Sequence, residues 1–384
     1  MTIGEVAANA RTSESVSASV IGLDVLRGLA AILVVLGHSR SMLADALGTS
    51  LTGAAWQKVI LLPTSFAQES VAVFFVLSGY LVGGQVLREV AAGRFSWRVY
   101  LAKRLSRLWT VLIPGLVLTL AIGILGGAMG GVWPKLDRYG GGLGIYPAVC
   151  NAAFLQEPRC GTYGSNDSLW SLAFEFWFYM IFAAATVFIV ALTRRVWARA
   201  AVGGVIAVGC LALFGHSLLL LIPSWLFGVV LASVHARWKA AGFPAWATVR
   251  GRGWTALLVA LLAVGMLASN VVNPSREVRF VLLGLCAAPL VLYLALSAGA
   301  VRNRCALAVA RSGKVSFSVY VYHLPIVKLL VTGLVAAWHP PLPAAVVLVY
   351  VVAAVAYVLC LPLWAVSERN THHVRVALRR LLRA

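Results

Sequence analysis

The stretch LDVLRGLAAILVVLGH, residues 23–38, is apolar yet carries three ionisable side chains, and a run of this kind predicts a membrane-spanning helix. Ten residues separate Arg27 from His38. At about 100° and 1.5 Å per residue this interval makes almost three turns, so both side chains are expected on one face, about 16 Å apart. Asp24 joins that face one turn earlier. Because an ionisable group is costly in hydrocarbon and normally faces a bundle interior or a wet cavity, the three residues form a predicted functional site.

The composition of the chain extends this interpretation to the whole protein. Of 384 residues, 61% are hydrophobic and 11% are charged, and the mean hydropathy is +0.90. These values exclude an ordinary soluble domain and predict an all-α, polytopic membrane helix bundle. Residues 1–20 are polar and are expected to form a disordered cytoplasmic tail, residues 21–367 the transmembrane domain, and residues 368–384 a basic, amphipathic cytoplasmic tail.

Apolar runs of about 18 residues or more predict about ten spans. The fifth and sixth are poorly separated, because only residues 215–217 interrupt the run, and either a tight hairpin or a re-entrant pair fits. The expected spans lie near residues 22–41, 69–87, 107–127, 169–192, 200–215, 217–234, 254–272, 280–299, 315–335 and 344–366.

The distribution of basic residues predicts the orientation of these spans. With a cytoplasmic amino terminus, 24 of the 32 Lys and Arg residues fall on the cytoplasmic side and seven on the other, while Lys328 lies within a span. This bias favours an even span count, both termini in the cytoplasm and a plasma (inner) membrane protein. The net charge of +20 is spread over short loops, which does not favour nucleic-acid binding.

Two further segments carry chemistry. In QESVAVFFVLSGYLVGG, residues 68–84, Glu69 opens a span whose small residues favour close helix packing. In YLAKRLSRLWTVLIPG, residues 100–115, Lys103, Arg104 and Arg107 follow helical spacing. They fit either a positive-inside anchor or a site that grips the phosphates of an acyl-coenzyme A donor, and both interpretations stay open.

Two later segments add a carboxylate and a second histidine. NDSLWSLAFEFWFYM, residues 166–180, places Glu175 about two turns deep in a span, and Trp170 and Ser171 fit a sugar subsite. In SGKVSFSVYVYHLPIV, residues 312–327, Tyr320 and His323 share a helical face, and Pro325 is expected to free nearby backbone carbonyl groups. A structural and a catalytic role for His323 both remain possible at this point.

These five segments, in this order, closely resemble those of the acyltransferase-3 family of integral-membrane acyltransferases. The resemblance implies transfer of an acyl group, usually acetyl, from cytoplasmic acyl-coenzyme A to a hydroxyl of a carbohydrate or other acceptor. It implies that His38 is the central catalytic residue, that Arg27 is essential, and that Arg104 and Arg107 are associated with the donor. The family often has a second acidic residue or Gln directly after the position of Glu175, where this chain has Phe176, so a scheme with two carboxylates there is not supported.

A base that works near pH 7 is required for acyl transfer to an alcohol, and His38 has a suitable side chain. We expect Glu175 or Asp24 to orient His38 or relay its proton, and Arg27 to bind the donor. Stabilisation of the thioester oxygen is expected from Tyr320, Ser39 or a backbone N–H. The residues do not distinguish direct transfer from a covalent acyl-histidine intermediate.

The remaining features concern the outer loop and the partners. Cys150 and Cys160, in the expected outer loop 128–168, are well placed for a disulfide. No bound cofactor or metal is expected. Acyl-coenzyme A, expected to be acetyl-coenzyme A, acts only as a co-substrate. The acceptor is expected to be a cell-surface, exported or lipid-linked glycan, as in polysaccharide modification of a cell envelope. Two alternatives are an acyltransferase for a small metabolite and a proton-coupled transporter of a solute or acyl-sugar; the oligomeric state is not predicted.

Overall fold

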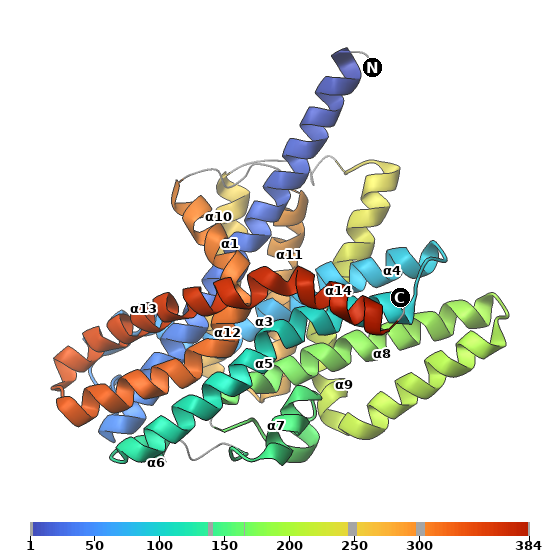
Figure 1. Ribbon diagram of the computed structural model, residues 1–384. Helices are drawn as coiled ribbons and strands as arrows, with labels where there is room; N and C mark the ends of the chain where they lie inside the picture. Colours follow the sequence, from blue (N-terminus) through green and yellow to red (C-terminus); the bar gives the residue numbers. More distant parts are fainter. Residues whose placement is uncertain (1–2, 137–140, 165, 245–251, 297–303, 383–384) are drawn as a thin grey trace. The chain divides into compact units, whose positions relative to one another are not determined.

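The computed structural model describes residues 3–136, 141–164, 166–244, 252–296 and 304–382 (Figure 1). Every regular element within these ranges is a helix of the α, 3-10 or π type, and none of the described residues forms a strand. The all-α architecture predicted from hydropathy is therefore confirmed. The α-helices are α1 (Ile3–Leu47), α2 (Ala55–Ile60), α3 (Ala67–Ser78), α4 (Gly84–Ala91), α5 (Trp97–Met129), α6 (Trp133–Leu136), α7 (Ile145–Ala152), α8 (Trp170–Thr193), α9 (Trp197–Ala241), α10 (Arg252–Val272), α11 (Arg276–Leu296), α12 (Arg304–Ala337), α13 (Leu342–Val366) and α14 (Thr371–Leu381).

Nine helical segments in the described part of the chain are long and apolar enough to cross a membrane. A further segment, Trp197–Leu213, is apolar but shorter. These segments follow the runs of hydropathy from which the spans were predicted, and the chain is a multi-pass membrane protein. Short 3-10 or π-helical turns connect several of them: η1 (Leu62–Ser65), η2 (Gly79–Gly83), η3 (Gln156–Cys160), η4 (Asp167–Leu169) and η6 (Glu368–Asn370).

The fifth and sixth predicted spans, 200–215 and 217–234, differ from the prediction because both belong to one helical element, α9. Residues 215–217 do not form the expected hairpin or re-entrant turn. A Gly costs only about 1 kcal/mol inside a helix, and an apolar surrounding favours backbone groups that stay hydrogen-bonded within the helix. Small or polar residues alone were therefore insufficient to end this helix.

Helix α1 also begins earlier than the sequence indicates. It starts at Ile3, within the segment 1–20 for which a disordered tail was expected. This segment is rich in Ala, and extending a helix that already exists avoids the cost of nucleation.

The described chain divides into two compact units, and we treat each by itself. The first unit comprises Met1–Ala30, Gln68–Arg88 and Leu219–Lys314. The second comprises Ala31–Ala67, Glu89–Leu218 and Val315–Ala384. Five helices, α1, α3, α4, α9 and α12, contribute to both.

In the first unit, residues 74–80 (FFVLSGY) pack against α9 through Gly79. A Cβ atom on Gly79 would lie 1.9 Å from the carbonyl oxygen of Trp225, and one on Gly228 would lie 2.0 Å from that of Val76. The Trp225 indole N–H also donates to Ser78 Oγ at 3.2 Å. The backbones of this stretch and α9 thus approach so closely that only glycine fits, which supports the packing role predicted for these small residues.

In the second unit, the proline of α12 organises a buried contact. Pro325 has no N–H, so the carbonyl of Val321, four residues earlier, lacks its usual helical donor. Asn166 Nδ2 donates to this oxygen at 3.0 Å, and Asn166 is completely buried. A side chain from the segment before α8 therefore completes the hydrogen bonding of α12, in line with the freed carbonyl expected at Pro325.

The segment between α5 and α8 is fastened at several points. Cys150 and Cys160 form a disulfide. Indole N–H groups of α5 and α8 donate to this segment, from Trp109 to Ala152 O at 2.9 Å and from Trp177 to Phe154 O at 2.8 Å. Trp177 thus has a specific structural partner.

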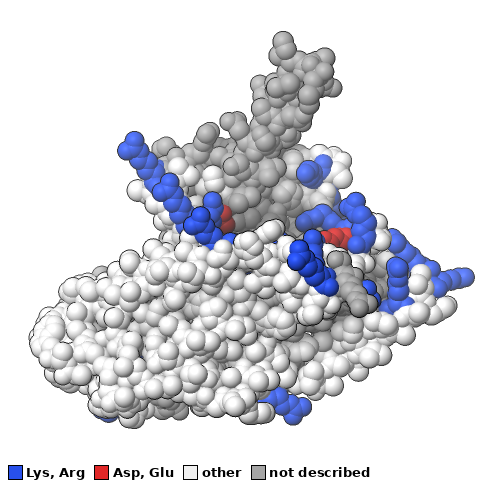
Figure 2. Space-filling view, in the orientation of Figure 1, with Lys and Arg blue, Asp and Glu red and all other residues white. Residues whose placement is uncertain are grey.

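The carboxyl-terminal segment expected as a basic amphipathic tail forms α14, which packs along α5 (Figure 1). Arg375 Nε lies 3.4 Å from Ser106 Oγ of α5. Figure 2 shows a broad face over α5, α12 and α13 that is largely without charged side chains. Exposed aliphatic residues such as Val117, Ile124 and Val347 lie on these helices, as expected for a surface in contact with lipid.

Candidate active site

Two of the predicted site histidines lie side by side in the second unit. The ring centroids of His38 on α1 and His323 on α12 are 5.2 Å apart, and the ring planes are inclined by 46°. His323 is fully buried, whereas His38 remains partly exposed. Imidazole is the side chain best suited to proton transfer near neutral pH, so this pair is the centre of the candidate site.

The hydrogen bonds of His323 indicate its tautomer. Its Nδ1 atom lies 2.9 Å from the carbonyl oxygens of both Val319 and Tyr320. Carbonyl oxygens only accept hydrogen bonds, so Nδ1 carries the proton, and in the neutral ring Nε2 is the acceptor. Within the described part of the protein this Nε2 atom has no hydrogen-bond partner. His323 therefore has an uncommitted basic nitrogen in the buried neighbourhood of His38.

A buried cation accompanies the histidine pair. Lys328, on α12, is completely buried, and its Nζ atom lies 3.8 Å from Asp167 Oδ2. Lys328 is also within electrostatic range of His38. A buried ammonium can stabilise negative charge that develops nearby, because little water screens it.

Tyr320 extends the polar cluster from the histidines toward α8. Its ring centroid is 6.1 Å from that of His323, and its hydroxyl lies 2.6 Å from Ser171 Oγ. One turn further along α8, Glu175 accepts a hydrogen bond from Tyr179 and is within electrostatic range of Tyr320. Ser171 and Tyr320, predicted on separate segments, are thus direct partners.

Tyr179 leads from this cluster to the basic residues of α5. The guanidinium of Arg104 stacks over the rings of Tyr179 and Tyr100, 5.5 Å and 5.4 Å from their centroids. Arg104 is buried, which is unusual for a residue whose only role is to anchor a helix at the membrane surface. Within the second unit, side-chain contacts thus connect His38 with Ser171 and, one turn further along α8, Glu175 with Arg104.

The other two basic residues of this segment have different surroundings. Lys103 is partly buried and forms an ion pair with Glu89 at 3.0 Å. Arg107 is exposed, and Arg375 of α14 contacts Ser106 next to it. The three residues were predicted as one set, but only Arg104 belongs to the buried cluster.

The remaining site residues of the second unit lie near these groups in the sequence. Ser39 follows His38 and is completely buried, and its hydroxyl oxygen has no hydrogen-bond partner among the described residues. Trp170 packs edge-on against Phe174, with centroids 5.8 Å apart. The Cys150–Cys160 disulfide belongs to the loop rather than to this cluster.

Asp24, Arg27 and Glu69 belong to the first unit. Asp24 Oδ1 and Arg27 Nη1 form an ion pair at 3.4 Å, as their spacing of three residues on one helical face allows. Asp24 is buried. The backbones of α1 and α12 meet closely beside this pair, since a Cβ atom on Gly313 would lie 2.1 Å from the carbonyl oxygen of Asp24.

Glu69 takes part in a separate buried cluster of the first unit. Its Oε1 atom accepts hydrogen bonds at 3.1 Å from Ser269 and Asn270 of α10. Arg279 Nη1 of α11 lies 3.7 Å from the same oxygen. Glu69 thus connects three helices, a structural arrangement that its position at the start of a span did not indicate.

Sequence reasoning did not select Lys328 and Asp167 as site residues. The charge of Lys328 inside a span was a usable signal, because such charges usually have a functional or pairing role. Asp167 lies at the start of a span, where an acidic residue has no comparable significance.

The helices and these clusters define an all-α, multi-pass membrane protein with two adjacent imidazoles, one of them fully buried, and a buried arginine. A family model described as an acyltransferase domain matches residues 20–363. The chain therefore belongs to the acyltransferase-3 family and is a membrane O-acyltransferase. Searches of curated proteins and of solved structures give no match to this chain.

Proposed function

We propose that the protein transfers an acyl group, most simply acetyl, from acyl-coenzyme A to a hydroxyl of a carbohydrate at the cell surface or in an exported or lipid-linked glycan. The contact between His38 and His323 carries this proposal, because both imidazoles share a buried, polar neighbourhood. The Lys and Arg bias of the loops further supports a plasma-membrane protein with both termini in the cytoplasm.

His38 is the general base in this proposal. Its imidazole nitrogen takes the proton of the acceptor hydroxyl while the hydroxyl oxygen attacks the thioester carbonyl carbon. The carbon–sulfur bond of the tetrahedral intermediate then breaks, and the coenzyme A thiolate leaves and takes up a proton. Partial exposure of His38 is consistent with access by an acceptor, and the buried Nε2 of His323 offers a second site for the proton.

Negative charge on the thioester oxygen needs stabilisation during this step. Lys328 is the favoured source, because its ammonium is completely buried and lies on the same helix as His323. The unpartnered hydroxyl of Ser39 is a second donor close to His38 in the chain. Tyr320 is already hydrogen-bonded to Ser171, which favours a positioning role for this tyrosine together with Glu175.

Binding of the donor is assigned to basic residues of α5. Arg104 holds a fixed orientation between two tyrosine rings, while Lys103 and the exposed Arg107 supply further positive charge for phosphate groups. Arg375 adds to this charge, because α14 packs on the same helix. Arg27, with Asp24 beside it in the first unit, is proposed as a further donor-binding residue. Trp170 and Ser171 are proposed for the acceptor.

The experiment that tests this function follows label from [acetyl-¹⁴C]acetyl-coenzyme A into the glycan fraction and the small-molecule fraction of membranes containing the protein. Label in glycan that depends on His38 supports the complete proposal. Label only in small molecules would replace the carbohydrate with a metabolite acceptor. If no acetyl-coenzyme A is consumed and a proton gradient drives solute uptake, the result would favour a transporter and contradict the proposal.

A further inference from the structure

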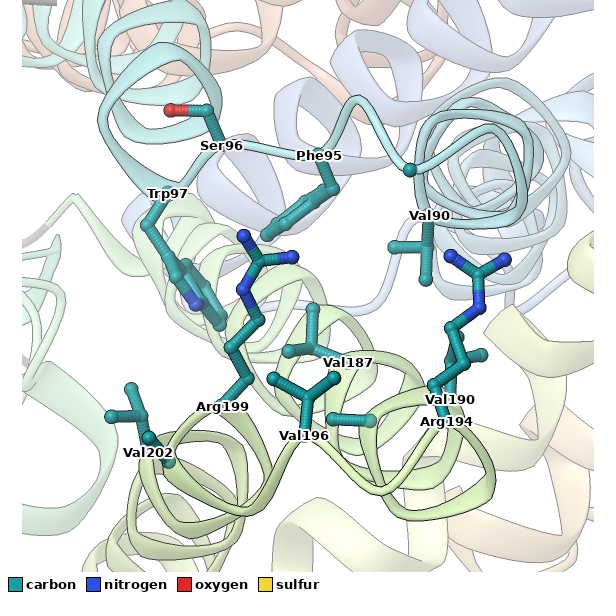
Figure 3. Close-up of a pocket in the computed structure, with 13 residues that line it drawn as sticks. Val90, Phe95, Ser96, Trp97, Val187, Val190, Arg194, Val196, Arg199 and Val202 are labelled. Atoms are coloured by element: carbon teal, nitrogen blue, oxygen red, sulfur yellow. The ribbon is translucent and has the colours of Figure 1, made fainter.

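A pocket of about 530 Å³ lies in the second unit, and no residue of the histidine cluster lines it (Figure 3). Residues from the end of α4, the following link, the first turn of α5, the end of α8 and the start of α9 surround it. None of these lining residues is a candidate catalytic or donor-binding residue. The pocket therefore requires an explanation of its own.

The walls of this pocket are mainly aliphatic. They include Val90 from α4, Val187 and Val190 from α8, and Val202 from α9. Phe95 and Trp97 close the side formed by the link and α5, and Trp97 is partly exposed (Figure 3). A tryptophan at the start of an apolar span is typical of the membrane–water interface. These walls suit hydrocarbon chains better than a polar metabolite.

Two arginines supply positive charge at this pocket. Arg194 and Arg199 both extend toward the segment that carries Val90 and Phe95, as Figure 3 shows. Arg194 Nη2 donates to the carbonyl oxygen of Ala91 at 3.1 Å, which fixes its guanidinium near the end of α4. The side chain of Arg199 is exposed, and no carboxylate belongs to the lining residues. The positive charge of the pocket is thus available to an anion from outside the chain.

Two helix starts strengthen the same preference. Trp97 begins α5, and Val196, Ala198 and Arg199 lie at the start of α9. The first N–H groups of a helix have no intrahelical acceptor, and the helix dipole favours negative charge at this end. Both helix starts lie in segments that the Lys and Arg bias assigns to the cytoplasmic side.

We propose that this pocket binds an anionic phospholipid of the inner leaflet, such as phosphatidylglycerol. An acyl chain packs against the valines, and the phosphate lies between Arg194 and Arg199. Apolar walls at the end of membrane-spanning helices and a pair of guanidinium groups together match this amphipathic ligand. The proposal is independent of the acyl transfer reaction.

The test measures lipid binding to the purified, delipidated full-length protein by native mass spectrometry. Phosphatidylglycerol and phosphatidylcholine with identical acyl chains are titrated against the wild type, the double variant Arg194→Ala/Arg199→Ala, and Val190→Trp, which fills the apolar part. The matched control, Arg237→Ala/Lys239→Ala, removes two exposed cations from the other end of α9. Elution volume and melting temperature show whether each variant is folded.

We expect the wild type and the control to bind phosphatidylglycerol in preference to phosphatidylcholine. The double Arg variant should bind phosphatidylglycerol about tenfold more weakly, since each basic side chain near an anionic lipid contributes favourably. Val190→Trp should weaken the binding of both lipids. Equal binding of the two lipids by the wild type, unchanged binding by the folded double variant, or displacement of the lipid by millimolar inorganic phosphate would overturn the proposal. If a variant does not fold, lysine replacements at Arg194 and Arg199 answer the same question, with a smaller loss expected.

Discussion

The imidazole rings of His38 and His323 lie 5.2 Å apart, centroid to centroid, although they belong to the first and the twelfth α-helix. The Nδ1 atom of His323 is committed to two backbone carbonyl groups, while its Nε2 atom has no partner within the described structure. The two nitrogens therefore have separable roles. Nδ1 fixes the ring in α12, and Nε2 is available for proton transfer beside His38.

This separation predicts the effect of His323→Asn. The asparagine amide can donate in place of Nδ1 but offers nothing in place of Nε2, so kcat for acyl transfer should fall about 100-fold, as expected for the loss of a group in acid–base catalysis. The melting temperature should stay close to that of the wild type. His323→Ala, which loses both nitrogens, should reduce kcat and melt at a lower temperature. A folded His323→Asn protein with normal kcat would show that Nε2 has no role.

Arg104 is predicted to act on the donor rather than the acceptor. Replacing it with Met keeps an unbranched side chain between the two tyrosine rings but removes the charge, so KM for acyl-coenzyme A should rise about tenfold or more, the expected cost of one charge-assisted hydrogen bond. Steady-state kinetics with both substrates varied give the measurement, and KM for the acceptor should not change. Arg380→Gln, at an exposed position of α14, is the matched control. A rise confined to the acceptor KM would contradict this assignment.

Lys328 and Asp167 are predicted to be coupled in stability. Lys328→Met leaves Asp167 without the cation, and loss of one partner from a buried ion pair costs about 3 kcal/mol. The cost should be larger for Asp167→Asn, because this variant leaves the ammonium of Lys328 without its carboxylate; the Lys328 side chain is 0% exposed, whereas that of Asp167 is 31% exposed. Unfolding of all three variants in detergent should show that the double variant loses less than the sum of the two single losses. Additive losses would indicate that the pair is not coupled.

The stability contributed by the hydrogen bond from Asn166 to Val321 O should depend on Pro325. Asn166→Ala should cost about 1–3 kcal/mol, because the buried carbonyl of Val321 then lacks a donor. In a Pro325→Ala background, residue 325 regains the N–H that a helix directs to residue 321, so Asn166→Ala should cost less. Chemical denaturation of the four proteins of this cycle gives both costs. Equal costs in the two backgrounds would show that Asn166 does not substitute for the missing N–H.

Hydropathy was sufficient to predict the helical class and the positions of most spans, because a membrane span requires a long apolar run in the sequence itself. It failed at residues 215–217, where the expected break between two spans is absent from α9. A weak local signal of Gly and Ser cannot decide whether a helix ends, since the competing backbone hydrogen bonds extend over many residues. The early start of α1 at Ile3 illustrates the same limit.

The individual site residues were accessible from the sequence, but their partners were not. Spacing along one helix relates Asp24 to Arg27, whereas contacts such as Ser171 with Tyr320 join residues on separate helices. No spacing rule predicts such a pairing. The contrast between buried Arg104 and exposed Arg107 likewise depends on Tyr100 and Tyr179, which pack around Arg104 only in the folded protein.

The most direct test of the central claim is transfer of labelled acetyl from acetyl-coenzyme A to glycan by membranes that contain equal amounts of wild type or His38→Ala. If His38 is the general base, the wild type labels the glycan and the His38→Ala protein, folded and correctly inserted, shows a rate at least about 100-fold lower. Transfer by His38→Ala at a rate near that of the wild type would contradict the account, because loss of the general base must slow the reaction.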